Sequence, residues 1–517
     1  MARQTEPGVT RQAEPGKARL VVDTDFTVAP VNDRLFGSFV EHLGRCVYTG
    51  LYEPGHPTAD ERGFRRDVID LVKELGVTTI RYPGGNFVSG YRWEDGVGPK
   101  EDRPRRLDLA WHSTETNEFG LHEMADWLDE VGGNELMEAV NLGTRGLESA
   151  LDLLEYANIP GGTELSDRRR ANGREKPFGI RMWCLGNEMD GPWQTGHMTA
   201  EEYGELALRV AAAMRMIDSD LELVACGSST HEMATYGEWE QTVLDKAYDV
   251  IDYVSCHAYF RPWDGDMVSF LASGEDMNRF IKEIAAIIDA AKAKRKSAHD
   301  VYLSFDEWNV WYAATDPLAN HGIDEWPVAP RLLEQVYTAA DAVVFGDLLI
   351  QLIRNADRVR SASLAQLVNV IAPIMTEPGG PSWRQTTFHP FADIARYAKG
   401  GTALTPNLAA PTIDTSRYGQ VDAIGSVAVR CADGSVAVFA VNRSMDETID
   451  FDIDLHGDAA SWTAATARTL HEDDLEARNT MDDPDRVVMH DNDSVRLGTG
   501  KATVTLPPVS FTTIHIR

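Results

Sequence analysis

The chain has 517 residues, which is too long for one ordinary domain and predicts two or three, although a (β/α) barrel alone can take about 250 residues or more. Hydrophobic residues make up 43% of the sequence, no apolar run approaches the roughly 18 residues that span a bilayer, and no N-terminal signal is present, so we expect a cytoplasmic protein without a membrane partner. The 81 acidic residues outnumber the 49 basic ones, and the net charge of −32 argues against nucleic acid or anionic lipid as partners, because both would be repelled.

The N-terminal segment divides into a tail and a strand. Residues 1–17 repeat RQTEPG as RQAEPG and contain almost no apolar side chains, so we predict a flexible tail. Residues 18–33 contain the alternating stretch ARLVVDTDFTVAP, which predicts a strand segment that joins the C-terminal domain.

Residues 34–387 alternate between short apolar runs and amphipathic helices. One helix is predicted over 64–75, ending at Gly76, and another begins with the capping box of Thr199 and Glu202. Eight stretches read as strands: LFGSFVE, TTIRYP, MEAVNL, IRMWCLGN, LELVACG, IDYVSCHAY, VYLSFDEWN and SLAQLVNV. Eight strands separated by helices favour a parallel (β/α)8 barrel, the TIM barrel, over an open doubly wound α/β sheet.

Residues 388–517 have a different pattern, in which strands predominate. The stretch SVAVRCADGSVAVFAVNR predicts two strands joined around Asp433 and Gly434, and IDFDIDL alternates apolar with acidic residues. The stretch KATVTLPPVSFTTIHI is also typical of strands. We therefore predict an all-β sandwich, similar to a jelly roll, as the second domain.

The sequence contains no metal or cofactor signature. HExxH, an EF-hand loop, paired CxxC, a phosphate loop and a GxSxG turn are all missing. The five cysteines are an odd number and widely spaced, so we expect buried free thiols and not disulfides. The expected chemistry uses neither a metal nor a cofactor.

Two carboxylates stand at the ends of predicted buried strands. In RMWCLGNEMD an apolar run stops at Gly186 and delivers Asn187 and Glu188, and in VYLSFDEWN the carboxylate is Glu307. Burying an unpaired carboxylate is costly, and a barrel holds its reactive groups at these strand ends. The fourth and seventh strands face one another across an eight-stranded ring. Such a pair suits glycoside hydrolysis, in which one carboxyl protonates the departing oxygen and the other attacks or activates water.

Several motifs, taken together and in order, resemble a known family. They are FVEHLGR, RYPGGNFVSGYRWEDGVGP, WHSTETNEFG, WCLGNEMDGPWQ, SCHAYF, FDEWNVWY and AQLVNVIAPI. From about Ala18 to the C-terminus the chain resembles the family 51 α-L-arabinofuranosidases, which are retaining barrel glycosidases. The resemblance implies that Glu188 is the acid/base, that Glu307 is the nucleophile, and that the protein is a homo-oligomer, often a hexamer. It implies a furanose pocket lined by Glu41, Asn86, Asn187, Tyr259 and Gln366, with walls shaped by Trp111 and Trp311.

Some of these residues also have plainer interpretations. Trp111 and Trp311 fit core filling as well as sugar stacking, and Glu188 alone could be a carboxylate at a helix start. Asn187 alone could be a turn former, but beside Glu188 we expect it to bind the sugar 2-OH.

Three further side chains are predicted to support the carboxylates. His257 and Tyr259 could be ordinary core residues, but at a strand end we expect Tyr259 to donate to Glu307 and keep it ionised. Arg81 would be an unpaired buried charge, so we expect it to pair with a site carboxylate.

The predicted activity is that of an exo-acting enzyme. The polar groups of Glu41, Asn86 and Gln366 would close around one ring, so a single terminal L-arabinofuranose would be released from arabinofuranosyl-containing oligosaccharides or polysaccharides. Two alternatives stay open at this point: another retaining barrel glycosidase, such as a β-xylosidase or endo-β-glucanase, and a non-catalytic sugar-binding protein, since barrels can lose catalysis and keep their pockets.

Overall fold

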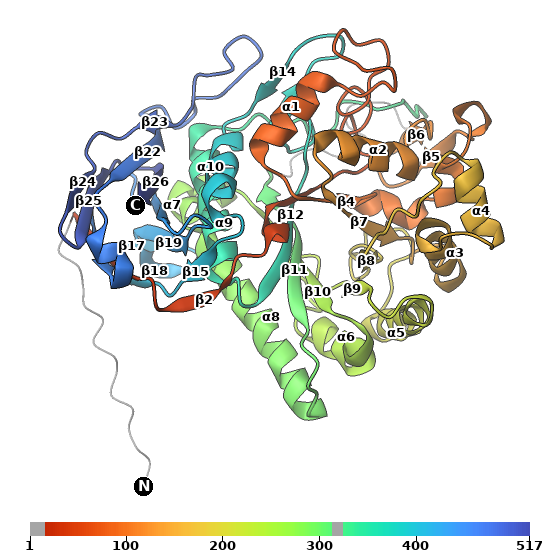
Figure 1. Cartoon of the computed structure of the whole chain (residues 1–517), viewed down its shortest axis with the longest axis horizontal. Coiled ribbons are helices and arrows are strands. Elements are labelled where there is room, and N and C mark those ends of the chain that lie inside the picture. Colours follow the sequence, from red (N-terminus) through yellow and green to blue (C-terminus); the bar gives the residue numbers. More distant parts are fainter. Residues whose placement is uncertain (1–15, 313–323) are drawn as a thin grey trace.

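The computed structural model describes residues 16–312 and 324–517, which form a barrel and an adjoining β-sandwich (Figure 1). The predicted flexible tail lies outside the described residues as far as residue 15. The strands drawn in blue, from the C-terminal part of the chain, gather on one side of the barrel.

Eight parallel strands close into a barrel, which confirms the predicted fold class. In ring order they are β3 (Gly37–Phe39), β4 (Thr79–Tyr82), β7 (Glu135–Val140), β8 (Met182–Leu185), β9 (Glu222–Ala225), β10 (Tyr253–Phe260), β11 (Tyr302–Val310) and β12 (Val359–Leu364). The prediction for the last strand, SLAQLVNV, is wrong in position because β12 ends at Leu364. Asn369 and Ile371 have φ values of 61° and 39°, which an extended strand does not adopt.

Helices connect these strands and surround the barrel. In chain order the α-helices are α1 (Arg66–Leu75), α2 (Leu121–Val131), α3 (Leu147–Asn158), α4 (Glu164–Ala171), α5 (Ala200–Ile217), α6 (Glu238–Ala247), α7 (Met267–Leu271), α8 (Ser273–Arg295), α9 (Ala339–Arg354) and α10 (Phe388–Ala398). Two of them begin or end as the sequence predicted. α1 ends at Gly76, whose φ is 84°, and the Thr199 side chain accepts the N–H of Glu202 at the start of α5.

The C-terminal domain contains two packed sheets with antiparallel pairs. The larger sheet has the order β2 (Thr27–Pro30), β15 (Thr402–Leu404), β19 (Ile424–Arg430), β20 (Val436–Asn442), β26 (Ser510–Ile516), β22 (Ala465–His471), β23 (His490–Asp491). The smaller has the order β16 (Asn407–Ala409), β1 (Lys17–Asp23), β21 (Ile449–His456), β25 (Lys501–Leu506), β24 (Arg496–Gly498). The alternating residues of β21 point their apolar side chains into the core between the sheets.

The N-terminal strands pair with this domain although they precede the barrel in the chain. β1 runs parallel to β21, and β2 runs antiparallel to β15. The boundaries proposed for the domains from the sequence stay predictions.

Within the described residues, three short two-stranded sheets complete the fold. They are β5 (Arg106–Asp108) with β6 (Ser113–Glu115), β13 (Ile374–Thr376) with β14 (Ser382–Arg384), and β17 (Thr412–Thr415) with β18 (Gly419–Asp422). The β5–β6 turn carries Trp111, and the β17–β18 turn contains residues 416–418.

The two domains share a buried interface along α9. This helix is apolar on almost every side, and it contacts β11 and β12 of the barrel as well as β19, β20 and β26 of the sandwich. At the interface Arg443, which follows β20, donates to Asp347 on α9 at 2.8 Å and to Glu275 on α8 at 2.9 Å. The side chain of Arg443 is fully buried.

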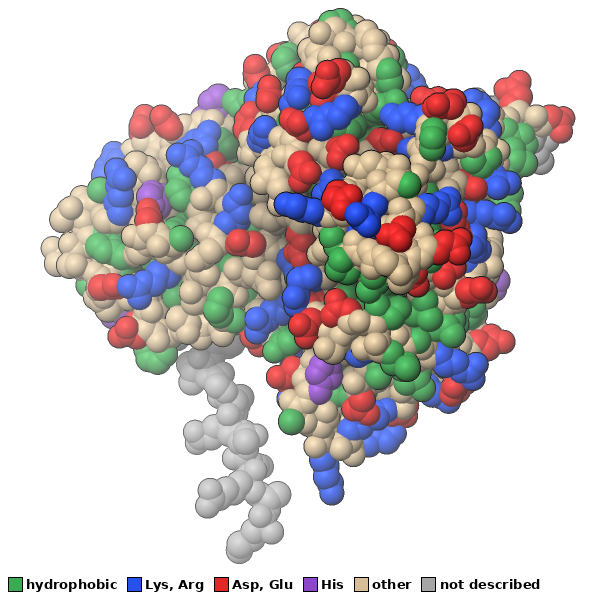
Figure 2. Space-filling view, turned by 45° about the vertical axis from the view of Figure 1, so that its right-hand side comes forward, with side chains coloured by type: hydrophobic (Ala, Val, Ile, Leu, Met, Phe, Trp, Pro, Cys, Tyr) green, Lys and Arg blue, Asp and Glu red, His purple; other side chains and the backbone are tan. Residues whose placement is uncertain are grey.

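The surface and the thiols agree with the composition. All five cysteines are buried and free, as predicted. Acidic and basic side chains are intermixed on the face shown in Figure 2, so the excess of acid does not gather there in one patch. Among the described helices none has the length and hydropathy that a membrane span needs.

Candidate active site

The two predicted carboxylates meet at the mouth of the barrel. Glu188 follows β8 after Gly186, and Glu307 belongs to β11. Glu188 has a φ of 44°, a left-handed conformation that is strained for a residue with a side chain. One oxygen of each carboxylate and a ring nitrogen of His257 all lie within 4.8 Å of one another. Both carboxylates are at least nine-tenths buried.

Glu307 is held by two donors that favour its ionised form. Arg81 Nη1 on β4 donates to Glu307 Oε1 at 2.9 Å, and the Tyr259 hydroxyl donates to Glu307 Oε2 at 2.7 Å. The sequence predicted the contact of Tyr259 with Glu307, and for Arg81 it predicted a contact with one of the site carboxylates. Burial raises the pKa of Glu307 and the neighbouring Glu188 raises it further, while the charges of His257 and Arg81 act in the opposite direction.

Glu188 has different neighbours. The indole N–H of Trp193 donates to Glu188 Oε2 at 2.8 Å, and His257 Nδ1 lies 2.9 Å from Glu188 Oε1. The other ring nitrogen of His257 lies 3.1 Å from Asp306 Oδ1. Burial lowers the pKa of His257, but Glu307, Asp306 and Glu188 together raise it to about 10, so the imidazole is cationic at neutral pH.

A third carboxylate, Glu41, lies across the mouth and organises the PGGN turn. Its Oε1 accepts the N–H of Phe87 at 3.0 Å and the indole N–H of Trp111 at 2.7 Å, and its Oε2 accepts the Gln366 amide at 3.0 Å. A Cβ on Gly85 would come within 2.1 Å of this carboxylate, so only glycine fits there. Burial raises the pKa of Glu41 to about 8.

These groups surround one cavity of about 640 Å³, which lies within the roughly 300–1,000 Å³ of small-molecule sites. Eight predicted site residues line it: Glu41, Asn86, Trp111, Glu188, Tyr259, Glu307, Trp311 and Gln366. The other three, Arg81, Asn187 and His257, lie beneath the surface of the cavity. Asn187 was expected in the lining, but its Oδ1 accepts Arg81 Nη2 at 2.6 Å and its Nδ2 donates to Asn86 at 3.4 Å.

Sequence reasoning missed several residues of this site. Trp193 stands five residues after Glu188 in the motif WCLGNEMDGPWQ, and Asp306 directly precedes Glu307. Both could have been found by asking which group partners each buried charge. Arg417 and Tyr418 also line the cavity, and nothing in the sequence indicates that the C-terminal domain reaches it.

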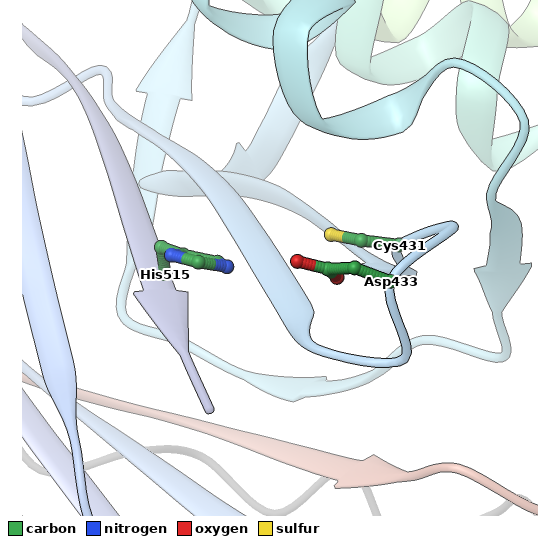
Figure 3. A group of neighbouring side chains, drawn as sticks. All are labelled: Cys431, Asp433 and His515. Carbon is green, nitrogen blue, oxygen red and sulfur yellow. The ribbon is translucent and has the colours of Figure 1, made fainter.

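Besides Glu188, His257 and Glu307, one other group of side chains in the described residues is close enough together to hold a metal ion, and it lies in the sandwich. Figure 3 shows His515 of β26 facing Cys431 and Asp433 of the β19–β20 turn, and one ligand atom of each lies within 4.8 Å of the others. Ser435 connects them, because its N–H donates to Asp433 Oδ1 at 3.0 Å and its hydroxyl lies 2.8 Å from His515 Nε2. Burial raises the pKa of the Cys431 thiol, which therefore stays protonated. We interpret the cluster as a hydrogen-bonded turn.

The arrangement at the barrel mouth fits one kind of chemistry. Two buried carboxylates with oxygens within 4.8 Å stand beside a cavity walled by tryptophan and tyrosine. Sugars present polar edges and apolar faces, and cleavage of a glycosidic bond needs one acid and one nucleophile or base. A (β/α)8 barrel with this site defines a glycoside hydrolase.

Comparisons with known proteins identify the family. Residues 71–278 match the model of the α-L-arabinofuranosidase 1 domain, and residues 306–510 match that of the α-L-arabinofuranosidase C-terminal domain. The chain is 68% identical to an exo-α-(1→6)-L-arabinofuranosidase of Bifidobacterium longum over 98% of both chains. It is 58% identical to an intracellular exo-α-(1→5)-L-arabinofuranosidase of Streptomyces lividans over 96% of this chain and 75% of that one.

Solved structures agree with these relatives. A family 51 α-L-arabinofuranosidase from Bifidobacterium longum superimposes with a TM-score of 0.92 at 52% identity, covering 98% of this chain and 100% of that one. The chain belongs to the α-L-arabinofuranosidases of glycoside hydrolase family 51 and is an exo-acting enzyme. The prediction made from the motifs is confirmed, and neither the β-xylosidase or endo-β-glucanase alternative nor the non-catalytic one is supported.

Proposed function

We propose that this enzyme releases terminal L-arabinofuranose by double displacement, with Glu307 as nucleophile and Glu188 as acid/base. In the first step a Glu307 oxygen attacks the anomeric carbon, the bond to the leaving oxygen breaks, and Glu188 gives its proton to that oxygen. In the second step Glu188 takes a proton from water, the water oxygen attacks the same carbon, and Glu307 departs. Two inversions restore the original configuration.

The close approach of the two carboxylates carries this proposal. Retaining enzymes hold them about 5–5.5 Å apart, whereas inverting enzymes leave about 6.5–9.5 Å for a water molecule. The nearest oxygens of Glu188 and Glu307 lie within 4.8 Å, which supports direct attack.

The charges of the buried groups support one proton on the pair of Glu188 and Glu307 in the resting enzyme. Arg81 and His257 supply two positive charges, and Asp306 and Glu307 supply two negative charges in the same buried region. An ionised Glu188, which also contacts His257, would make a third negative charge beside only two positive ones, and an excess buried charge is costly. Since Arg81 contacts Glu307 and not Glu188, we assign the proton to Glu188 and the negative charge to Glu307.

The substrate is an arabinose-containing oligosaccharide, and for its linkage we propose a preference for α-(1→6) over α-(1→5). The relative named for the α-(1→6) linkage is 68% identical, whereas the relatives named for the α-(1→5) linkage are 58% identical or less. Arabinose has only five carbons, so a (1→6) linkage joins it to a hexose. Relative rates on an arabinofuranosyl-(1→6)-hexoside and on α-(1→5)-arabinobiose test this preference, and faster cleavage of the arabinobiose contradicts it.

The mechanism is tested by following the released sugar by NMR. Retention predicts that the first arabinofuranose released from an aryl α-L-arabinofuranoside is the α anomer, before mutarotation. First release of the β anomer would overturn the double displacement. Turnover of aryl β-D-xyloside or β-D-glucoside at a comparable rate would instead contradict the assigned sugar.

We also propose that the enzyme acts inside the cell as a homo-oligomer, such as a hexamer. The names of several relatives, including that of Streptomyces lividans, begin with "Intracellular". The apolar side chains of Leu107 and Leu109, more than half exposed near Trp111, offer a surface for a second copy. Light scattering that gives the mass of a single chain would contradict the oligomer.

A further inference from the structure

Two consecutive acidic residues of β11, Asp306 and Glu307, face the same histidine of β10. In a regular strand successive side chains point to opposite faces, but β11 has one extra residue at this point. Ser255 of β10 pairs with Ser304 of β11. The next pair is His257 with Glu307, so one residue of β10 stands opposite two of β11. The pairing of β11 with β12 is irregular at the same place. This β-bulge lets both carboxylates turn toward His257.

The imidazole of His257 lies among three carboxylates. Its Nε2 is 3.1 Å from Asp306 Oδ1. Its Nδ1 is 2.9 Å from Glu188 Oε1 and 3.6 Å from Glu307 Oε2. The ring is cationic, so both nitrogens carry a hydrogen, and the Nε2 hydrogen is directed to Asp306. Only 2% of His257 and 1% of Asp306 is exposed, so water screens these contacts little.

Asp306 contacts both cations of the site without touching the cavity. Besides His257 it faces Arg81, whose Nε lies 3.7 Å from Asp306 Oδ2. The Cys184 thiol is 3.8 Å from the same oxygen. Asp306 is absent from the lining of the cavity, so it has no direct access to a sugar. Any effect of this carboxylate on the reaction must therefore pass through its neighbours.

Double displacement moves a negative charge across His257. In the resting enzyme Glu307 is ionised and Glu188 is protonated. Once Glu307 has formed the ester and Glu188 has given its proton to the leaving oxygen, the negative charge lies on Glu188. Because Nδ1 of His257 lies within 3.6 Å of both carboxylates, the same N–H can serve either one. The cation stays in place while the negative charge changes its position.

We propose that Asp306 is a positioning residue that keeps His257 as a fixed cation, and that this cation stabilises Glu188 as the base of the second step. Arg81 contacts Glu307 and not Glu188, so without the charge of His257 an ionised Glu188 would be buried beside no cation. Such a charge is costly, and the base form would be less populated. This inference rests on the proposed function, because it takes Glu188 as the base.

The experiment removes the charge and keeps the hydrogen bonds. Asp306→Asn retains an oxygen that can accept the Nε2 hydrogen of His257. His257→Asn retains an N–H near the position of Nδ1, and it carries the test if the first variant does not fold. The control is Cys184→Ala, which removes another neighbour of Asp306 without changing a charge. The substrate is dinitrophenyl α-L-arabinofuranoside, whose good leaving group speeds the first step, and rates are measured with and without azide.

For Asp306→Asn we expect kcat to fall about tenfold, because the second step lacks part of its base. The value of kcat/KM, which reports the first step on this substrate, should fall less than about threefold. Azide attacks without giving up a proton, so it should restore kcat and give arabinofuranosyl azide with the configuration of the substrate. His257→Asn should show the same pattern, and Cys184→Ala should behave like the wild type.

Three results would overturn the proposal: an equal fall in kcat and kcat/KM, no response of the slowed variants to azide, or an unchanged kcat in the folded variants. A merely structural role of Asp306 gives the first two, since a displaced site slows both steps and azide does not repair it. Failure of the proposed function has a different signature, because it appears in the wild type as release of the opposite anomer.

Discussion

Arg81 is the residue on which the charges of the site depend. Its guanidinium is almost fully buried, and it donates to Glu307 at 2.9 Å and to Asn187 at 2.6 Å while its Nε lies 3.7 Å from Asp306. Loss of this cation would leave two buried carboxylates with only His257 as a counter-charge. The same side chain therefore supports both the fold and the ionised form of Glu307, the proposed nucleophile.

We predict that Arg81→Met lowers kcat by about 10²-fold or more, because a positioned donor to the reacting carboxylate is lost. Breaking a buried ion pair should also lower the free energy of unfolding by about 3–5 kcal/mol. Urea unfolding and steady-state rates measure the two effects. The control is Arg19→Met, whose half-exposed ion pair with Asp454 should contribute less than about 1 kcal/mol. Near-normal kcat in Arg81→Met would contradict the assigned role.

Gly85 permits the approach of the PGGN turn to Glu41. Its φ is 68°, and an added Cβ would lie 2.1 Å from the Glu41 carboxylate. Gly85→Ala should therefore displace Glu41 and raise KM by about tenfold or more, since a side chain predicted to bind the sugar is misplaced. Gly146→Ala is the matched control, because Gly146 has a φ of 80° and no atom within 4 Å of its added Cβ. Both variants strain the backbone, but only Gly85→Ala crowds Glu41. Equal KM values in the two variants would therefore contradict the role given to the contact between Gly85 and Glu41.

At the scale of elements, α1 precedes β4, the strand that carries Arg81, and ion pairs and hydrogen bonds hold its first turn. The Asp67 carboxylate accepts Arg65 Nη2 at 2.7 Å and the Thr58 hydroxyl at 2.7 Å. Burial raises the pKa of Asp67, but these bonds lower it to about 2. A pKa below the unfolded value means that the contribution to stability is present above pH 4, approximately, and is lost as the pH falls through about 2.

Asp67→Asn should therefore reduce the free energy of unfolding at pH 7 by about 2 kcal/mol, and the difference from the wild type should vanish near pH 2. Unfolding in urea at a series of pH values measures it. Asp70→Asn changes an exposed carboxylate of the same helix and should have little effect at any pH. If the difference in the free energy of unfolding between wild type and Asp67→Asn stayed constant from pH 7 to pH 2, the lowered pKa of Asp67 would not be its cause.

Elements were predictable from the sequence where local pattern and structure agree. Periodicity, the capping box at Thr199 and the stop at Gly76 depend on neighbouring residues, so they are readable locally. The last barrel strand was misplaced because AQLVNV, residues 365–370, is as apolar as a strand, yet it forms the loop that presents Gln366. The Asn309 side chain holds this loop at both ends, donating to the Ala365 carbonyl and, at 2.5 Å, to the Ile371 carbonyl. Contacts with residues distant in the chain therefore determine the conformation of this segment.

At the scale of the whole molecule, the two domains act as one unit. Arg443 of the sandwich contacts Asp347 and Glu275 in the helices behind the barrel, and its side chain is fully buried. We predict that Arg443→Met lowers the free energy of unfolding by about 3–5 kcal/mol and divides thermal unfolding into two transitions. Calorimetry checks this against Arg430→Ala, which should unfold like the wild type. A single transition at the wild-type temperature would contradict the prediction.

The candidate site shows the same limit on prediction from sequence. Glu188 and Glu307 could be picked out because one follows the end of β8 and the other lies near the end of β11, at the mouth of the barrel. The place of Arg417 in the cavity lining could not be predicted, because it depends on how the sandwich packs against the barrel. No local sequence pattern encodes that packing. Asn187 was predicted to line the cavity, but in the structure it accepts a hydrogen bond from Arg81. This contact joins residues far apart in the chain, so no local sequence pattern indicates it.

The central claim is that Glu188 and Glu307 have different roles, and azide rescue tests it most directly. In Glu188→Ala an activated aryl arabinofuranoside should still form the covalent intermediate, because a good leaving group needs no proton, and the second step should stall for lack of a base. Added azide should restore turnover and give arabinofuranosyl azide with the configuration of the substrate. In Glu307→Ala any azide product should have the inverted configuration. The reverse pattern in the two variants, or near-normal hydrolysis by both, would contradict the account.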